Sequence, residues 1–475
     1  MFTDKIKNTL INILKVSSSN IIIMLSGILV GLLLPKILGI ADYGYYRTFT
    51  LYTSYVGLFH FGFSDGIYLK YGGKRYDELD KGQFRLYSRF IIGLELIISL
   101  LILTFAMIFL SHQYRFIFVC VGIYLVVNNI TSYYQIISQI TGRFNELSTR
   151  NILQSTLTSV ILILLLVIHN ISDKSISYRT YTITTLIISG LLACWYVYTY
   201  RDIVFGKIKT AFYRESMWSF IVLGFPLTIS NLCSTLILTI DRQFVNVLFS
   251  TKVYAIYAFA YNLLALVTTA LNSISTVLYP TMKRIDDNNA VRDSYNNLIM
   301  WVLILVSLCL AVFFPLSWFI HWFLPKYVES LAFFKIILPG LIFSSAVTLI
   351  IHNYYKIEGE NVLFFKKTVI VLILSIIVSW LAYIIFKTPK SISIAAMLIM
   401  IFWYVYMNQF FVKRYHIESS KNFKYACIIS IIFYITSSCN NSCITLFIYL
   451  SLFIVTTYFF YSEQIYRLFK GDAQR

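Results

Sequence analysis

Residues 88–110 of the chain read SRFIIGLELIISLLILTFAMIFL, an apolar stretch long enough to cross a lipid bilayer. A transmembrane helix needs about 20 mainly apolar residues, because the helix rises about 1.5 Å per residue and the hydrocarbon core is about 30 Å thick. Only Arg89 and Glu95 are charged in this stretch, and Arg89 lies at its beginning. The stretch predicts a membrane-spanning helix with one ionisable group inside it.

Thirteen further stretches of this kind occur, so we expect an all-α integral membrane protein with fourteen spans. The loops between them are too short for a soluble domain. The expected spans are 16–38, 48–69, 88–110, 116–138, 150–169, 179–200, 218–240, 254–279, 298–320, 331–351, 366–386, 391–412, 425–438 and 444–461.

The composition agrees with a chain that lies mostly in lipid. Hydrophobic residues make up 58% and charged residues 13% of the 475 residues, whereas a soluble domain carries about 25% charged residues. The net charge of +18 would indicate a nucleic-acid partner in a soluble protein. No basic stretch is interleaved with aromatic residues on a soluble domain, so we expect no nucleic-acid binding.

The positions of Lys and Arg predict the orientation of the spans. With the N-terminus inside, the inner segments hold 28 of the 39 Lys and Arg residues. Short cytoplasmic loops are enriched in these residues, so we expect both ends of the chain to be cytoplasmic. The inner segments are 1–15, 70–89, 139–150, 201–217, 280–297, 352–367, 413–424 and 462–475.

The two halves of the chain resemble each other. Ser19-Asn20 recurs 211 positions later as Ser230-Asn231, and Tyr43-Gly44-Tyr45-Tyr46 recurs at the same offset as Tyr254-Ala255-Ile256-Tyr257. Chance matches in a chain rich in Tyr and Ile are the alternative. A true repeat predicts two parallel, pseudo-symmetric six-helix lobes, an architecture typical of transporters. The predicted domains are an N-terminal lobe at 1–205, a C-terminal lobe at 206–420 and a C-terminal helix pair at 421–475.

Five ionisable side chains in or beside the spans are functional candidates, because such groups are costly in lipid. Each has a structural alternative. Asp65 is close enough to the inner basic loop to pair with it, and Glu95 can pair with another helix. Asp241 and Arg242 can form a surface pair of little energetic value. The guanidinium of Arg47 can bind phosphate in a fork or anchor the span at the interface.

Uncharged polar residues within the spans form a second group. In lipid they must face protein or water, and contact between helices is the alternative to substrate contact for each. Asn128, Ser132 and Gln135 fall on one face of the fourth span. Together the group predicts a hydrated cavity lined by hydroxyl and amide groups, which suits sugars. Its members are Asn20, Asn128, Asn129, Ser132, Gln135, Asn231, Tyr257, Tyr261, Asn262 and Asn272.

Several kinds of chemistry have no signal in the sequence. We find no G-x-x-x-x-G-K-[ST] phosphate loop, no G-x-S-x-G turn and no residues at metal-ligand spacing. The seven cysteines also lack zinc spacing. We therefore expect no catalytic residue, no metal, no cofactor and a protein that is not an enzyme.

Short motifs at corresponding places in the two halves support a family resemblance. These are Leu38-Gly39-x-x-x-Tyr43-Gly44-x-Tyr46, Gly142-Arg143, Ile240-Asp241-Arg242-x-Phe244 and Tyr254-x-x-Tyr257-x-x-Ala260-Tyr261. They resemble motifs of bacterial polysaccharide flippases, in the multidrug/oligosaccharidyl-lipid/polysaccharide exporter superfamily. Twelve spans in two lobes plus a helix pair also agree, so the resemblance covers essentially the whole chain.

The resemblance implies a flippase for an undecaprenyl-diphosphate-linked oligosaccharide, either an O-antigen or a capsule repeat unit. It would work by alternating access in the bacterial cytoplasmic (inner) membrane. Besides the substrate and membrane lipids, the implied partners are a polysaccharide polymerase and a chain-length regulator. The implied substrate contacts are Arg47 and Arg242 for phosphate and Asn20, Asn231, Tyr257 and Tyr261 for sugar. The implied coupling or gating groups are Asp65, Glu95 and Asp241.

Two rival functions remain open. A cation-coupled multidrug exporter of the same superfamily would need an acidic cavity, and the first span carries no carboxylate, although Asp65 lies in the second. The first span also departs from the strongly basic one of lipid II flippases, since it carries only Lys36. An oligosaccharide polymerase would need a large outer loop, which the chain lacks.

Overall fold

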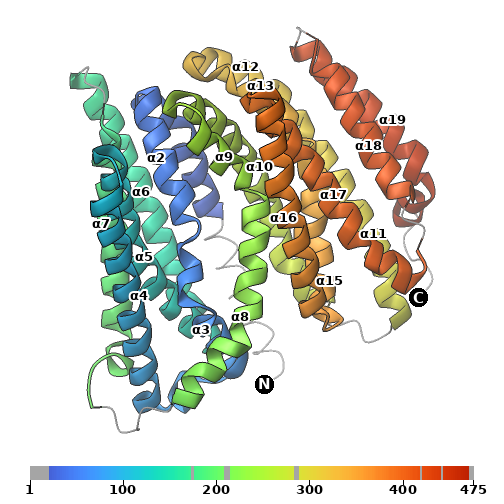
Figure 1. Ribbon diagram of the computed structural model, residues 1–475. Coiled ribbons are helices and arrows are strands. Elements are labelled where there is room, and N and C mark those ends of the chain that lie inside the picture. The colour runs from blue at the N-terminus through green and yellow to red at the C-terminus, as the bar shows by residue number, and fades with distance from the viewer. Residues whose placement is uncertain are drawn as a thin grey trace. The chain divides into compact units, whose positions relative to one another are not determined.

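The computed structural model describes residues 21–172, 176–207, 214–282, 288–417, 420–439 and 442–469. Within these ranges, some helical residues are described by their backbone alone. The longest such stretches are 269–282 and 288–293. Helices make up nearly all of the described chain, which contains no strand (Figure 1). The all-helical fold expected from the sequence is confirmed.

Ten of the described helices are long and apolar enough to cross a membrane, and a bent helix pair raises the number to eleven. Each of the fourteen expected spans overlaps a described helix. The first overlaps the short apolar helix Ile21–Ile37, and the thirteenth overlaps a helix of 17 residues, Ser420–Thr436. The expected second span, 48–69, is divided between two helices. The expected count of fourteen is therefore approximate.

The helix that contains the 88–110 stretch shows why these helices need a membrane. This helix, α4 (Lys81–Phe109), buries Ile91 and Glu95 completely but leaves Ile97, Leu101 and Ile108 62–66% exposed. A large apolar face of this kind is unfavourable in water. It is stable when lipid covers it.

The chain divides into two compact units. Unit 1 comprises Met1–Thr235 and Ser250–Ala255, and unit 2 comprises Leu236–Phe249 and Ile256–Arg475. In unit 1, α5 is the central helix and packs against α2, α4, α6 and α7. Besides α4, the main helices of unit 1 are α2 (Ile40–Thr53), α3 (Phe63–Tyr71), α5 (His112–Ile140), α6 (Phe144–Ser172), α7 (Tyr178–Thr199) and most of α8 (Arg214–Ile237).

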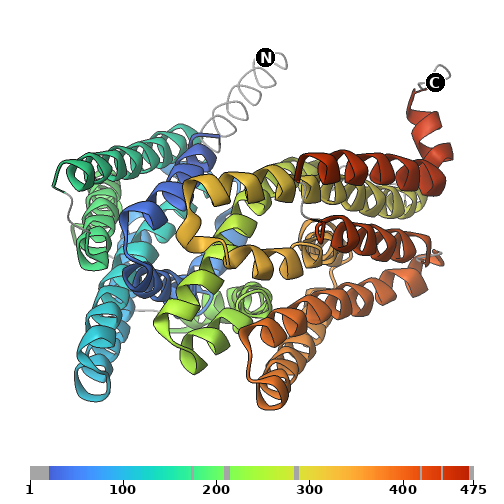
Figure 2. The ribbon, with the colours of Figure 1, turned by 90° about the horizontal axis from the view of Figure 1, so that it is seen from above.

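In unit 2, α17 is central and packs against α9, α13, α14 and α16, and α18 packs along α19 (Figures 1 and 2). The helices of unit 2 are α9 (Ile240–Leu248), most of α10 (Thr251–Met282), α11 (Asn288–Cys309), α12 (Phe313–Phe323), α13 (Ser330–Ile337), α14 (Gly340–Ser345), α15 (His352–Ile357), α16 (Asn361–Phe386), α17 (Pro389–Tyr415), α18 (Ser420–Thr436) and α19 (Ser442–Phe469).

The expected second span is broken between α2 and α3. A short 3-10 turn, Val56–His60, follows α2. Phe61 and Gly62 then take left-handed backbone angles, with φ of 48° and 84°. Glycine adopts positive φ without a steric penalty, whereas Phe does so rarely. The imidazole Nδ1 of His60 accepts a hydrogen bond of 3.1 Å from the Gly62 N–H, which helps to hold the break.

Three glycines allow α3 and α8 to cross at backbone contact. A Cβ added at Gly62 would lie 2.3 Å from the backbone nitrogen of Phe225, and one at Gly66 would lie 2.1 Å from the carbonyl oxygen of Phe220. From the other side, a Cβ at Gly224 would lie 2.0 Å from the Gly62 oxygen. Small residues permit such close helix approach in membranes.

Candidate functional site

Unit 2 contains a cavity of about 290 Å³ beside α9, α10, α14 and α17. Arg242 is the only formally charged residue among those that line it, and the other polar groups are hydroxyls. The lining residues are Leu238, Arg242, Tyr261, Leu264, Ala265, Thr268, Leu341, Ser344, Ser345, Thr348 and Met400.

Asp241 lies beside this cavity in the first turn of α9 and is only 1% exposed. Its Oδ2 accepts a hydrogen bond of 2.6 Å from Tyr257 and a second from Tyr261. Its Oδ1 has no partner among the described residues. Tyr257 and Tyr261 are four positions apart on α10, so one helix face provides both donors. A carboxylate in the first turn also interacts favourably with the helix dipole.

The guanidinium of Arg242 is held in place from two sides. One terminal nitrogen donates to the backbone oxygen of Leu238 at 3.0 Å, and the Tyr261 ring centroid lies 4.5 Å from the guanidinium carbon. The Nε is buried and has no partner among the described residues. The other terminal nitrogen makes no hydrogen bond with a described residue, so it is left for a ligand in the cavity.

A π-helical segment contributes hydroxyl groups to the same cavity. α14 ends at Ser345 and runs into the π-helix Ala346–Ile351, which contains Thr348. The Thr348 hydroxyl donates to the Ser344 oxygen at 3.0 Å. Such π-helical turns are rare and occur frequently at functional sites. Sequence reasoning missed Ser344, Ser345 and Thr348, because nothing in the apolar stretch 331–351 marks the change in helix type.

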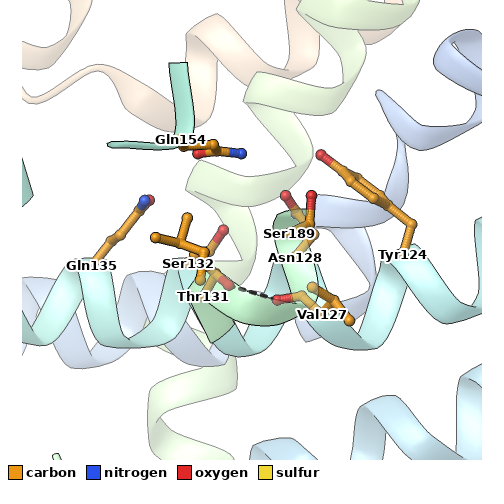
Figure 3. Close-up of a pocket in the computed structure, with 9 residues that line it drawn as sticks. Tyr124, Val127, Asn128, Thr131, Ser132, Gln135, Gln154 and Ser189 are labelled. Carbon is orange, nitrogen blue, oxygen red and sulfur yellow. Dashed lines mark hydrogen bonds between the residues drawn. The ribbon is translucent and has the colours of Figure 1, made fainter. Parts of the chain in front are cut away.

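Unit 1 contains a smaller cavity of about 70 Å³ whose lining is polar but uncharged. Figure 3 shows its side chains, with a hydrogen bond of 2.8 Å from the Thr131 hydroxyl to the Val127 oxygen. The structure brings together Asn128, Ser132 and Gln135, which the sequence places on one helix face. The lining residues are Tyr124, Val127, Asn128, Thr131, Ser132, Gln135, Gln154, Ser189 and Leu192.

A buried charged network lies near one end of unit 1. The side chain of Arg150 is 3% exposed. It donates to Thr199 at 2.6 Å, pairs with Glu146 at 3.3 Å and lies 4.0 Å from the Tyr196 ring centroid. The hydroxyl of Tyr200 also donates to Glu146, at 3.1 Å. Sequence reasoning missed Arg150, since it lies in an inner basic segment where charge is expected.

Asp202, just after α7, joins three elements of unit 1 outside the spans. Its carboxylate accepts a hydrogen bond of 2.6 Å from Tyr76 and pairs with Lys81 at 3.0 Å, and its backbone oxygen accepts from Arg85 at 2.8 Å. Burial alone would raise the pKa of Asp202, but the contacts with Tyr76 and Lys81 outweigh burial and hold that pKa below its ordinary value. Burial and the hydrogen bond to the Asp202 carboxylate raise the pKa of Tyr76.

Asp65 and Glu95 both belong to unit 1, and neither is among the residues that line its cavity. Asp65 accepts a hydrogen bond of 2.5 Å from Thr228 at the glycine crossing of α3 and α8. Both carboxylate oxygens of Glu95 are buried without a hydrogen-bond partner among the described residues. Asn129 is its polar neighbour, but the Asn129 amide donates to the Val56 oxygen at 2.9 Å. Glu95 is therefore an uncompensated buried carboxyl group.

The remaining expected site residues are Arg47, Asn231 and Asn20. Neither Arg47 nor Asn231 is among the residues that line the two cavities. Arg47, in unit 1, lies over the ring of Tyr43 with its guanidinium carbon 5.8 Å from the centroid. Its backbone oxygen accepts a hydrogen bond of 3.2 Å from Tyr254. Asn231 is exposed on α8, and Asn20 lies outside the described residues. The structure thus brings Asp241, Arg242, Tyr257 and Tyr261 together within unit 2, whereas Asn231 belongs to unit 1. The described chain has no cluster of three or more His, Cys, Asp or Glu suited to a metal.

The described helices are those of a multi-pass helical membrane protein. The structure is similar to the lipid II flippase MurJ in its inward closed conformation, with a TM-score of 0.69 at 16% identity, covering 96% of this chain and 100% of that one. It is also similar to an outward-facing multidrug resistance MATE family transporter of the MOP superfamily, with a TM-score of 0.53 at 11% identity, covering 85% and 96%. A MOP superfamily transporter from Pyrococcus furiosus gives a TM-score of 0.54 at 13% identity, covering 86% and 96%.

The sequence matches the polysaccharide biosynthesis protein family over residues 9–286, which is more than half of the chain. The chain belongs to this family. The search of curated proteins found no match. Family and fold together confirm the resemblance read from the sequence motifs.

Proposed function

We propose that the protein is a flippase for a lipid-linked oligosaccharide, an O-antigen or capsule repeat unit carried on undecaprenyl diphosphate. The observation that carries the proposal is the cavity of unit 2, where Arg242 is the only formally charged lining residue, the other polar groups are hydroxyls and no lining residue is a carboxylate. Such a cavity favours an anion. Membership of the polysaccharide biosynthesis family and the likeness to a lipid II flippase support it.

The diphosphate would bind to the free donors of Arg242. A guanidinium binds phosphate through parallel hydrogen bonds, and such charge-assisted bonds are stronger than neutral ones. The hydroxyls of Ser344 and Ser345 lie in the same cavity and offer additional donors. In unit 1, Arg47 has no carboxylate partner among the described residues, which makes it a second candidate phosphate contact. Asn231, Tyr257 and Tyr261 remain candidate contacts for the rest of the substrate.

Translocation by alternating access needs a group whose state differs between conformations. Asp241, Glu95 and Asp65 are the candidates for coupling or gating. Asp241 has one oxygen without a partner and is next to Arg242, so a cation or proton at Asp241 would change the field at the proposed phosphate site. Glu95 is buried without compensation, a costly state for a carboxylate. Asp65 would act at the break in the second span.

Export of cationic drugs is the second candidate function, because the fold is also that of multidrug transporters. A cationic substrate calls for carboxylates in its cavity. None of the residues that line either cavity is one. The Pyrococcus furiosus transporter is described as having a binding pocket of reversed polarity that suggests a different function. In this chain, the presence of Arg242 and the absence of a carboxylate among the residues that line the unit 2 cavity favour an anionic substrate, and therefore the flippase.

The proposed setting is the bacterial cytoplasmic membrane, with both ends of the chain in the cytoplasm. That orientation follows the distribution of Lys and Arg in the sequence. The proposed protein partners are the polymerase that joins repeat units and the regulator of chain length. Both would act on the product of the flippase.

Deletion of the gene tests the proposal. We expect surface polysaccharide to be lost and lipid-linked oligosaccharide to accumulate in the cytoplasmic leaflet. The wild-type gene should restore the surface polysaccharide, and Arg242→Ala should not. Unchanged surface polysaccharide in the deletion strain would contradict the flippase. Increased sensitivity to cationic drugs, with normal polysaccharide, would support the exporter instead.

A further inference from the structure

We propose that the uncharged cavity of unit 1 binds a neutral sugar residue of the transported glycan. This inference rests on the proposed flippase function and names a recognition site for part of its substrate. The site is built from three helices: α5 provides most of the lining, α6 provides Gln154, and α7 provides Ser189 (Figure 3).

The lining follows from the register of α5. Residues three or four positions apart share one helix face. Tyr124, Asn128, Thr131, Ser132 and Gln135 have this spacing, so one continuous polar stripe runs along the helix. A stripe of this kind on a membrane helix has to face protein or water. Here it faces the cavity.

Three of the polar groups have their hydrogen-bonding capacity left for a ligand. Ser132, Gln154 and Ser189 make no side-chain hydrogen bond with any described residue, although all three line the cavity. Thr131, by contrast, is satisfied by the backbone oxygen of Val127. Hydroxyl and amide groups both donate and accept. They match the hydroxyl and acetamido groups of a sugar, which also donate and accept.

The volume and charge of the cavity restrict the ligand. A volume of about 70 Å³ is several times the roughly 10–15 Å³ that one water needs. It accommodates the hydroxyl-bearing edge of one ring rather than a whole oligosaccharide. Burial of a charge without a partner is costly, and the lining has no ionised side chain. The cavity should therefore select neutral sugars over uronic acids.

Binding of three synthetic probes to the purified full-length protein tests this inference. The probes are a short-chain prenyl diphosphate, the same lipid carrying one N-acetylglucosamine, and the same lipid carrying one glucuronic acid. We expect the N-acetylglucosamine probe to bind about tenfold more tightly than the bare lipid, since two or three neutral hydrogen bonds are gained. The glucuronic acid probe should show no such gain.

Substitutions of two lining residues test whether the gain in affinity from the sugar arises in this cavity. Gln154→Leu and Ser189→Ala should each remove most of the gain from the sugar while leaving the affinity for the bare lipid unchanged. Thr185→Val is the matched control, because Thr185 is one turn from Ser189 on α7 and its hydroxyl is already bonded to the Tyr181 oxygen at 2.9 Å. It should keep the full gain.

The outcomes separate this inference from the function on which it rests. Equal affinity of wild-type protein for the bare and N-acetylglucosamine probes would overturn the sugar site and leave the flippase standing. An equal gain with glucuronic acid would overturn the selection for neutral sugars. If no probe binds, the lipid-diphosphate substrate itself is wrong, and the sugar site fails with it.

Discussion

The hydroxyl of Tyr257 on α10 donates a hydrogen bond of 2.6 Å to the buried carboxylate of Asp241 on α9. Tyr261, one turn further along α10, donates to the same oxygen. These bonds fix the first turn of α9 against α10. Because Arg242 is the next residue, they also fix the guanidinium at the edge of the unit 2 cavity. The acidic residue and the arginine therefore belong to one structural element.

We predict that Tyr257→Phe destabilises the protein by about 2 kcal/mol, because a hydrogen bond to a charged acceptor contributes about 1.5–3 kcal/mol. Thermal denaturation of the detergent-solubilised protein measures this change. Tyr458→Phe is the control, since Tyr458 is 67% exposed and should melt as the wild type does. A melting temperature of Tyr257→Phe equal to that of the control would mean that the bond does not hold α9.

The glycine crossing of α3 and α8 should tolerate no side chain. We predict that Gly66→Ala lowers the free energy of unfolding by about 3 kcal/mol, since its Cβ would lie 2.1 Å from a backbone oxygen of α8. Gly93→Ala on α4 is the matched control, because a Cβ there meets nothing within 4 Å. It should stabilise the helix by about 0.5–1 kcal/mol. Equal melting temperatures for the two variants would contradict the close crossing.

The free energy of unfolding should fall at acidic pH, because the Asp202 carboxylate becomes protonated. Its pKa in the folded protein is below its ordinary value, so the folded state favours the charged form. The stabilisation is complete above the unfolded pKa of about 4 and is lost as the pH falls through the folded pKa. Thermal denaturation at several pH values between about 2 and 6 tests this expectation. We predict that the melting temperature of Asp202→Asn depends less on pH in this range than that of the wild type. Asp77→Asn, at an exposed position, should leave the pH dependence unchanged, and an identical profile for both variants would contradict the assignment.

Affinity for the diphosphate should depend on Arg242. We predict that Arg242→Ala weakens binding of a bare prenyl diphosphate at least about tenfold, and that Arg242→Lys restores only part of the loss, because an ammonium group cannot form the guanidinium fork. Arg47→Ala tests the second candidate contact in the same assay. Lys390→Ala removes an exposed positive charge from unit 2 and controls for net charge. If Arg242→Ala and Lys390→Ala bind the lipid equally well, the phosphate assignment is wrong.

The sequence predicted the fold well, because the apolar length of a span is a local property. All but the last residue of the stretch 88–110 lies within α4, and the other expected spans also overlap helices. The break in the second span could not be predicted. It depends on positive φ at Phe61, a residue type that gives no such signal. It also depends on the crossing of Gly62 and Gly66 with Gly224, which are far apart in the sequence.

The sequence singled out many of the candidate site residues but not their neighbours. Asp241 and the Tyr257 and Tyr261 stripe stood out separately, since charge and helical spacing are visible along the chain. Their contact is a tertiary feature. Ser344 and Thr348 were missed because a serine or threonine in an apolar span carries no distinguishing signal. Their place at the cavity becomes apparent only with the π-helical turn.

Translocation by the purified protein in liposomes tests the central claim most directly. Prenyl-diphosphate-linked N-acetylglucosamine would be placed in both leaflets, and its accessibility to a membrane-impermeant enzyme would be followed over time. The account predicts that wild-type protein makes the inner-leaflet pool accessible far faster than empty liposomes do, and that Arg242→Ala abolishes most of this increase. Wild-type protein that moves the lipid no faster than empty liposomes, yet exports a cationic dye, would contradict the flippase.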